Sequence, residues 1–205
     1  MPLQLSMQKP GQAAPKLSLS LKKGARFSVE LAWDSPHDLD AHALLATNSG
    51  GGAKVGDLGH VLSTYNMVEN NPAGALKKNP NGSFSTPGGA VTHSGDCRDG
   101  TIAGVDETIT VDGSKVPAEV NEIPIFVTIH KATENGATFA QVKTASIRIK
   151  DESGALLGEY ELSREFGSFN AVQMGSLVHD AQGWHFAAVG NGFSGDFNTV
   201  LGYFS

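Results

Sequence analysis

The stretch EIPIFVTIHK, residues 122–131, carries the strongest strand pattern in the chain and decides its fold class. Successive side chains of a strand point to opposite faces of its sheet. One face here carries Ile123, Ile125, Val127 and Ile129, and the other carries Phe126 and Thr128. Apolar residues on both faces are typical of the covered centre of a sheet. We therefore predict a central, buried strand over this stretch.

Alternating apolar runs on both sides of this stretch indicate further strands. The runs 17–21 and 27–33 flank a glycine-containing turn, which predicts one hairpin. A second hairpin is predicted from the runs 145–149 and 155–163, which flank another such turn. About ten such runs at short intervals predict an all-β protein built as a two-sheet β-sandwich with short helical segments. The side chains predicted to be largely buried are Leu31, Trp33, Ile125, Val127, Ile129, Ile147 and Phe186.

The end of the chain departs from the strand pattern. Phe197, Val200, Leu201 and Phe204 recur at helical spacing, which predicts a short C-terminal helix. The length of 205 residues suits one domain, so we predict a single domain over residues 1–205. Residues 67–89 are low in apolar side chains, which predicts a flexible loop or insertion within it.

Charge and cysteine content narrow the function classes. A formal net charge of −6 argues against a nucleic-acid partner held through its phosphates, and suits cations and basic partners. The single cysteine, Cys97, precludes an internal disulfide and favours a reducing compartment. Residues 1–15 lack the apolar core of a signal peptide, and no stretch is long enough for a membrane span. We therefore expect a cytoplasmic protein that does not itself span a membrane.

The loop GDCRDGTIAGVDE, residues 95–107, concentrates acidic side chains between two predicted strands. Its carboxylates are Asp96, Asp99, Asp106 and Glu107. Carboxylates with the carbonyls of a glycine-rich backbone are the oxygen ligands that Ca²⁺ takes. The loop is not an EF-hand, because Thr101 stands where that motif requires glycine. A solvated acidic loop without a metal remains the alternative.

The segment DSPHDLDAHALLA, residues 34–46, offers a second pair of acids. Asp38, Asp40 and His42 share one face of an extended chain, with leucine and alanine on the other. Aspartate is depleted from strands, so two at this spacing favour metal ligands. His42 is expected to be an exposed neighbour without a ligand role.

Several motifs in the same order resemble the tellurium-resistance TerD family. They are LAWD at 31–34, DLDA at 38–41, TYN at 64–66, HSGDCRDGTIAGVDE at 93–107, VTIHKA at 127–132 and GWHFAAVGNGFSG at 183–195. The resemblance implies a Ca²⁺-binding β-sandwich without known catalysis, linked to tolerance of tellurite and other stresses. The ligands that it implies are Asp38, Asp40, Asp96, Asp106 and Glu107.

The acidic loop departs from the family pattern. Thr101, Ala103 and Val105 stand where the family carries acids, and Asp99 is an acid gained. Three alternatives stay open: one bound ion, two weakly held ions, or a lost site. With Asp99 added, the predicted metal ligands are Asp38, Asp40, Asp96, Asp99, Asp106 and Glu107.

The resemblance, together with the acidic residues, favours a non-catalytic calcium-binding stress-response module over two other functions. Its expected partners are calcium ions and proteins, including those of a membrane-associated stress complex. One alternative is an interaction scaffold whose metal site has decayed. The other is a metal-dependent hydrolase that uses Asp38, Asp40 and His93, although a structural role suits His93 better. Because converging carboxylates repel one another without a cation, Asp40→Asn is expected to cost the metal-free protein little.

Overall fold

The computed structural model describes residues 3–4, 16–21, 26–162, 166–181 and 183–205. The strands are β1 (Leu3–Gln4), β2 (Lys16–Leu21), β3 (Arg26–Trp33), β4 (Leu39–Leu44), β5 (Ala46–Asn48), β6 (Ala53–Val55), β7 (Val61–Leu62), β8 (Phe84–Ser85), β9 (Val91–His93), β10 (Glu107–Asp112), β11 (Glu122–Ile129), β12 (Ala145–Asp151), β13 (Leu156–Glu161), β14 (Ala171–Asp180) and β15 (Gly183–Phe193). The helices are α1 (Ala132–Asn135) and α2 (Phe197–Gly202), with single 3₁₀ turns η1 (Leu58–His60), η2 (Thr64–Asn66), η3 (Pro87–Gly89) and η4 (Phe139–Gln141).

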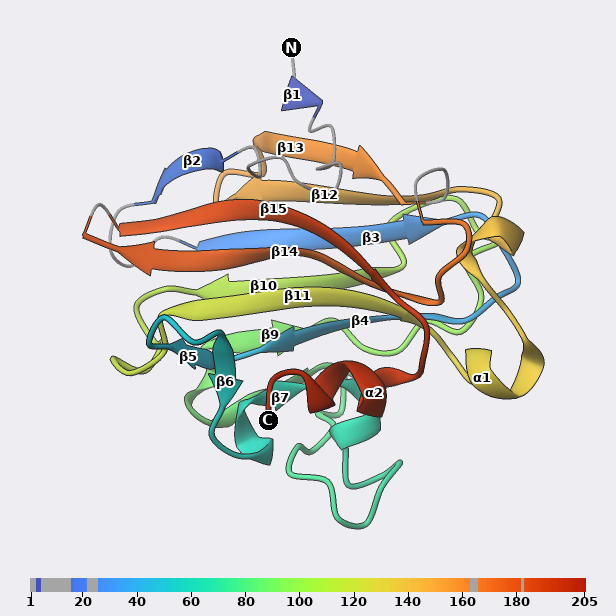
Figure 1. Ribbon diagram of the computed structural model, residues 1–205, viewed down its shortest axis with the longest axis horizontal. Helices are drawn as coiled ribbons and strands as arrows, with labels where there is room; N and C mark the ends of the chain where they lie inside the picture. The colour runs from blue at the N-terminus through green and yellow to red at the C-terminus, as the bar shows by residue number, and fades with distance from the viewer. Residues whose placement is uncertain (1–2, 5–15, 22–25, 163–165, 182) are drawn as a thin grey trace.

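Two mostly antiparallel sheets form a sandwich (Figure 1), which confirms the predicted fold class. The seven-stranded sheet has the order β1-β13-β12-β3-β10-β9-β8. The eight-stranded sheet has the order β2-β15-β14-β11-β4-β7, with β5 joined to β11 and β6 to β5. Side chains from both sheets meet in one apolar core, and all seven side chains predicted to be buried are at most 4% exposed.

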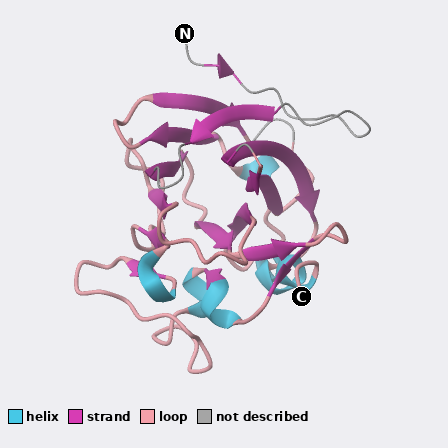
Figure 2. Ribbon diagram, turned by 90° about the vertical axis from the view of Figure 1, so that its left-hand side faces the viewer, coloured by secondary structure: helices cyan, strands magenta, loops and turns pink. Residues whose placement is uncertain are grey.

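The central strand is β11, as the sequence predicts. It pairs with β14 on one side and β4 on the other. Its isoleucines lie in the core between the sheets, while Phe126 belongs to a second apolar cluster on the outer face. Helix α2 covers that face through Phe197 and Val200, and Figure 2 shows most helical segments gathered on one side of the strands. The C-terminal helix is therefore confirmed.

Strand pairing confirms one predicted hairpin and corrects the other. β12 and β13 pair with Ile147 opposite Tyr160. β2 and β3, however, belong to different sheets, with β2 against β15 and β3 between β10 and β12. Alternation fixes which side chains share a face, but it does not choose a partner strand.

Residues 67–89 are mostly turns and loop, as predicted, and they contain β8. Three apolar side chains anchor the segment, because Met67, Leu76 and Phe84 are at most 2% exposed. Its mobility stays a prediction.

The segment before residues 67–89 combines a short strand and a 3₁₀ turn. Val61–Leu62 form β7, and Thr64–Asn66 form η2. The Ser63 side chain accepts from the Tyr65 backbone N–H and caps this turn. The turn places Thr64 and Tyr65 beside the start of β4.

The acidic segments meet at one end of the sandwich, where β11 runs into α1 (Figure 1, right). Ile129 pairs with Leu39, so Asp38 and His130 are neighbours at this end. The β9–β10 loop, residues 94–106, returns to the same end because Glu107 pairs with Leu31 of β3. Within the described residues, no helix is long and apolar enough to cross a membrane.

Candidate metal centre

Three of the predicted ligands form one carboxylate cluster. One oxygen from each of Asp38, Asp40 and Asp96 lies within 4.8 Å of the others. Asp38 and Asp40 come from the start of β4 in the eight-stranded sheet, and Asp96 from the loop after β9 in the seven-stranded sheet. The cluster therefore spans the two sheets.

Asp38 has a buried carboxylate oxygen that no protein donor satisfies. Its Oδ1 is buried without a hydrogen-bond partner. Burial, followed by the like charges of Asp40 and Asp96, raises the pKa of Asp38 from 3.8 to about 7. A buried carboxylate oxygen without a donor is unfavourable unless a proton or a cation reaches it. The all-oxygen cluster fits a hard cation such as Ca²⁺, which takes 6–8 oxygen ligands.

Asp40 is held ionised by its neighbours. Thr64 Oγ1 donates to its Oδ1 over 2.7 Å, and the Tyr65 hydroxyl donates to its Oδ2 over 2.9 Å. Nδ1 of His130 lies 3.7 Å from that Oδ2 and 2.8 Å from the Tyr65 oxygen. Burial alone would raise the pKa of Asp40, but His130 and the two hydroxyl donors outweigh it and lower the pKa.

Sequence reasoning did not assign Thr64, Tyr65 and His130 to the site. The signal was present, because TYN and VTIH are two of the motifs that carry the family resemblance. The ring of Tyr65 stacks on His130 with 5.6 Å between centroids, which fixes the hydroxyl beside Asp40. Asp40→Asn would place an amide against these donors, so the expectation that the metal-free protein tolerates it well does not suit this structure.

The expectation of an exposed His42 is wrong. His42 is 0% exposed and lies on the outer face of β4, beneath Phe197 of α2 with ring centroids 4.3 Å apart. Its Nε2 is 2.9 Å from Thr128 Oγ1, and its Nδ1 has no hydrogen-bond partner. Burial lowers the pKa of His42 to about 4, so the ring is neutral near pH 7. The alternating pattern placed His42 on the correct face, but it could not show that a helix covers that face.

Asp96 completes the cluster from the loop. Its Oδ2 accepts from Arg98 Nε over 2.9 Å, and the Arg98 side chain is 73% exposed. A carboxylate offers about four lone-pair sites on its two oxygens, so Asp96 keeps acceptor capacity for a cation.

Glu107 braces the two sheets beneath the cluster. Its Oε2 accepts from the Ala41 backbone N–H over 2.7 Å, and its Oε1 accepts from the Cys97 backbone N–H over 3.3 Å. Nε2 of His93 lies 3.3 Å from Oε2, and both side chains are fully buried. Burial raises the pKa of Glu107. A role as metal ligand stays a prediction for this residue.

Asp106 and Asp99 lie outside the cluster of three. Asp106 Oδ2 accepts from the Trp33 backbone N–H over 2.9 Å. Asp99 is exposed, and its Oδ1 accepts from the Thr101 backbone N–H over 2.9 Å. Both carboxylates therefore order the loop through backbone donors, and a metal-ligand role stays a prediction for each.

Cys97 and His93 lack the surroundings of catalytic groups. Burial raises the pKa of the Cys97 thiol, and the Asp106 and Glu107 carboxylates raise it further, so the thiolate is disfavoured. His93 is fully buried, with its ring stacked on Phe84 at 4.7 Å. A base at that depth does not face a substrate arriving from solvent.

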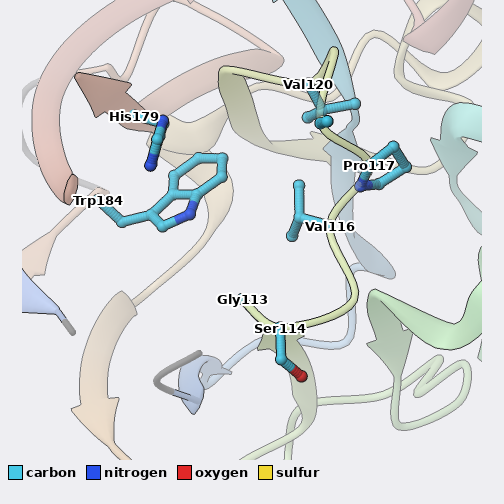
Figure 3. Close-up of a pocket in the computed structure, with 8 residues that line it drawn as sticks. Gly113, Ser114, Val116, Pro117, Val120, His179 and Trp184 are labelled. Atoms are coloured by element: carbon cyan, nitrogen blue, oxygen red, sulfur yellow. The ribbon is translucent and has the colours of Figure 1, made fainter. Parts of the chain in front are cut away.

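A separate hollow of about 370 Å³ lies at the other end of the sandwich, by the β10–β11 connection and the β14–β15 turn (Figure 3). Val116, Pro117 and Trp184 give it apolar walls, and His179 lies against the Trp184 ring at 5.1 Å. Eight residues of β11 separate this end from the acidic cluster. At about 3.3 Å per residue, the two sites lie too far apart to share a small ligand.

Comparison with known proteins places the chain in a family. A family model described as the TerD domain matches residues 78–204. The tellurium resistance protein TerD of Serratia marcescens is 31% identical over 204 residues, covering 90% of this chain and 95% of the relative. The chain belongs to the TerD family.

Two proteins of Bacillus subtilis (strain 168) show comparable identity to this chain. YceE of Bacillus subtilis (strain 168) is 34% identical over 200 residues, covering 87% of this chain and 93% of YceE. General stress protein 16U of the same organism is 31% identical, covering 87% and 93% of the two chains. A solved homologue of telluride resistance protein TerD from Streptomyces coelicolor A3(2) superposes with a TM-score of 0.63 at 22% identity, covering 87% of this chain and 95% of that one. That likeness concerns the fold alone.

Proposed function

We propose that this TerD-family protein is a non-catalytic, calcium-binding stress-response module of the cytoplasm that acts through protein partners. The observation that carries the proposal is the buried, unpartnered Oδ1 of Asp38 within the cluster of three carboxylates. The names of the relatives, among them TerD and general stress protein 16U, support the link to tellurium resistance and stress.

Each of the three aspartates has a different role in binding Ca²⁺. Asp40, fixed by Thr64 and Tyr65, offers a preset ionised ligand. Asp38 offers an oxygen without a donor, and Asp96 brings the β9–β10 loop to the same point. The bound dication would supply positive charge that offsets the repulsion among the three carboxylates. It would thereby tie one sheet to the other at this end.

Calorimetric titration of chelator-stripped protein with Ca²⁺ tests the proposal. We expect saturable binding to the wild type and at least a tenfold weaker Kd for Asp38→Asn, equivalent to about 1.4 kcal/mol. Asp99→Asn is the matched control, because it removes one charge from the same loop outside the cluster and keeps an oxygen for the Thr101 N–H. Its affinity should stay within about threefold of wild type.

Two results would contradict the assignment. If the wild type gives no heat of binding, the calcium proposal fails, and the alternative of an interaction scaffold with a decayed metal site is favoured. Equal losses in Asp38→Asn and Asp99→Asn would show that the ion is not held specifically by the cluster of three.

A further inference from the structure

The hollow at the end of the sandwich away from the carboxylate cluster contains a hydrogen-bond donor that no protein group satisfies. The chain has two tryptophans, and both are buried, with Trp33 4% and Trp184 6% exposed. The Trp33 Nε1–H donates to His37 O over 2.9 Å, whereas the Trp184 Nε1–H has no acceptor within the part of the chain that the structure describes. A buried indole N–H usually finds a partner. This one faces the hollow instead, toward the space between Val116 and Ser114 (Figure 3).

Backbone hydrogen bonds hold the walls of the hollow in place. The Val120 N–H donates to Pro117 O over 3.0 Å and closes a turn in the β10–β11 connection. This connection is attached to the eight-stranded sheet, because Asn121 O accepts from the His179 N–H of β14 over 2.9 Å. Trp184 pairs with His179 in the β14–β15 ladder, which fixes the indole on the facing wall (Figure 3). A hollow of about 370 Å³ with fixed walls has the size of a small-molecule site and needs little ordering on binding.

The lining of the hollow indicates the chemical class of a ligand. Val116, Pro117 and the Trp184 ring form apolar walls, which suit an aromatic ring. Among the described residues that line it, none is Lys, Arg, Asp or Glu, so a charged ligand would lose hydration without gaining a counter-charge. The indole N–H is a donor only, so the ligand has to present an acceptor. An uncharged aromatic ring that bears a carbonyl oxygen meets all of these requirements.

We propose that this hollow binds a small, uncharged aromatic carbonyl compound through the Trp184 Nε1–H. The carbonyl oxygen accepts from Nε1 in place of water, and burial of the ring against Val116 and Pro117 supplies the net gain. The site goes beyond the proposed calcium function and does not depend on it, because the length of β11 separates the two ends of the sandwich. Binding should therefore be the same with Ca²⁺ and with a chelator.

Titration of the ¹⁵N-labelled full chain with acetophenone, followed by ¹H–¹⁵N correlation NMR, tests the proposal. The two indole N–H resonances are assigned with Trp184→Phe, and Trp33, whose N–H is already bonded to His37 O, is the internal control. We expect the Trp184 resonance to move saturably in the millimolar range while the Trp33 resonance stays in place. Benzoate, which presents a carboxylate on the same ring, should bind about tenfold more weakly or worse.

Two variants locate the bound ligand. Val116→Phe fills the hollow from a half-buried wall position and should weaken acetophenone binding about tenfold or more. Val105→Phe is the matched control, because Val105 is 43% exposed in the loop at the opposite end, and it should keep the wild-type Kd.

Four results would overturn the proposal. They are a Trp184 resonance that does not move, one that moves without saturation together with Trp33, an unchanged Kd in Val116→Phe, and benzoate binding as tight as that of acetophenone. None of them bears on calcium, and a failed Ca²⁺ titration leaves the expected acetophenone result unchanged. The two proposals therefore fail separately.

Discussion

At the scale of single residues, the two aspartates of the DLD segment differ in kind. Asp40 is satisfied by Thr64, Tyr65 and His130, whereas Asp38 keeps a buried oxygen without a donor. The alternation in the sequence predicted both as ligands, but it could not rank them. The groups that distinguish them lie at least 24 positions away along the chain.

The difference predicts opposite effects for two similar substitutions in the metal-free protein. Asp38→Asn removes a half-buried charge that is repelled by Asp40 and Asp96, so it should raise the free energy of unfolding. Asp40→Asn sets an amide against hydroxyl donors and leaves His130 without its carboxylate, so it should lower that free energy by about 1–3 kcal/mol. Urea unfolding in chelator measures both. A loss of stability in Asp38→Asn as large as that in Asp40→Asn would contradict the distinction.

The raised pKa of Asp38 predicts a pH dependence with a definite sign. Its folded-state pKa of about 7 lies above the ordinary value of 3.8, so the folded state binds a proton that the unfolded state releases. Stability of the metal-free protein should therefore fall as the pH rises from about 4 to about 7. Solvent screening at this half-buried group limits the fall to about 1–2 kcal/mol.

Unfolding in chelator at pH 5, 6, 7 and 8 measures this dependence. Asp38→Asn should flatten the decline, whereas Asp99→Asn should keep it. A free energy of unfolding that rises with pH through this range, by the same amount in the wild type and in both variants, would contradict the assignment.

At the scale of elements, the sequence predicted the strands, their faces and the terminal helix better than it predicted which strands pair with one another. The alternation in residues 122–131 located β11 and both of its apolar faces, because local side-chain direction is a property of the strand itself. The β12–β13 hairpin followed from a short turn. β2 and β3 separated into different sheets because pairing depends on strands far along the chain, such as β15 and β10.

Helix α2 covers the outer face of the site, which gives it a structural role that can be measured. Phe197 is 6% exposed and packs on His42 at 4.3 Å and on Tyr65 at 5.7 Å. Phe197→Ala should destabilise the protein by about 3–5 kcal/mol, because it leaves a cavity under the helix. Tyr203→Ala is the control on the same segment, since Tyr203 is 63% exposed, and should change stability by about 0.5 kcal/mol or less. Equal losses of stability for Phe197→Ala and Tyr203→Ala in urea unfolding would show that packing of α2 on this face does not stabilise the fold.

At the scale of the whole molecule, the cluster joins the two sheets at one end of the sandwich. Asp38 and Asp40 belong to one sheet, Asp96 to the loop of the other, and Glu107 crosses between them through the Ala41 N–H. The family resemblance implied that both acidic segments supply ligands to one site. The sequence could not choose among six carboxylates, since backbone contacts of Asp99, Asp106 and Glu107 arise only in the folded chain.

The central claim is that a calcium ion held by Asp38, Asp40 and Asp96 ties the sheets together. Thermal unfolding of the wild type and Asp38→Asn, each in Ca²⁺, Mg²⁺ or chelator, tests it most directly. A hundredfold excess of Ca²⁺ over Kd should stabilise the wild type by about 2.7 kcal/mol, which corresponds to a rise in Tm of about 5–10 °C for a chain of this size. Mg²⁺ should give much less, because it demands octahedral geometry and keeps its waters, and Asp38→Asn should lose most of the calcium gain. Equal wild-type melting temperatures in Ca²⁺ and chelator would contradict the account and favour a scaffold with a decayed site.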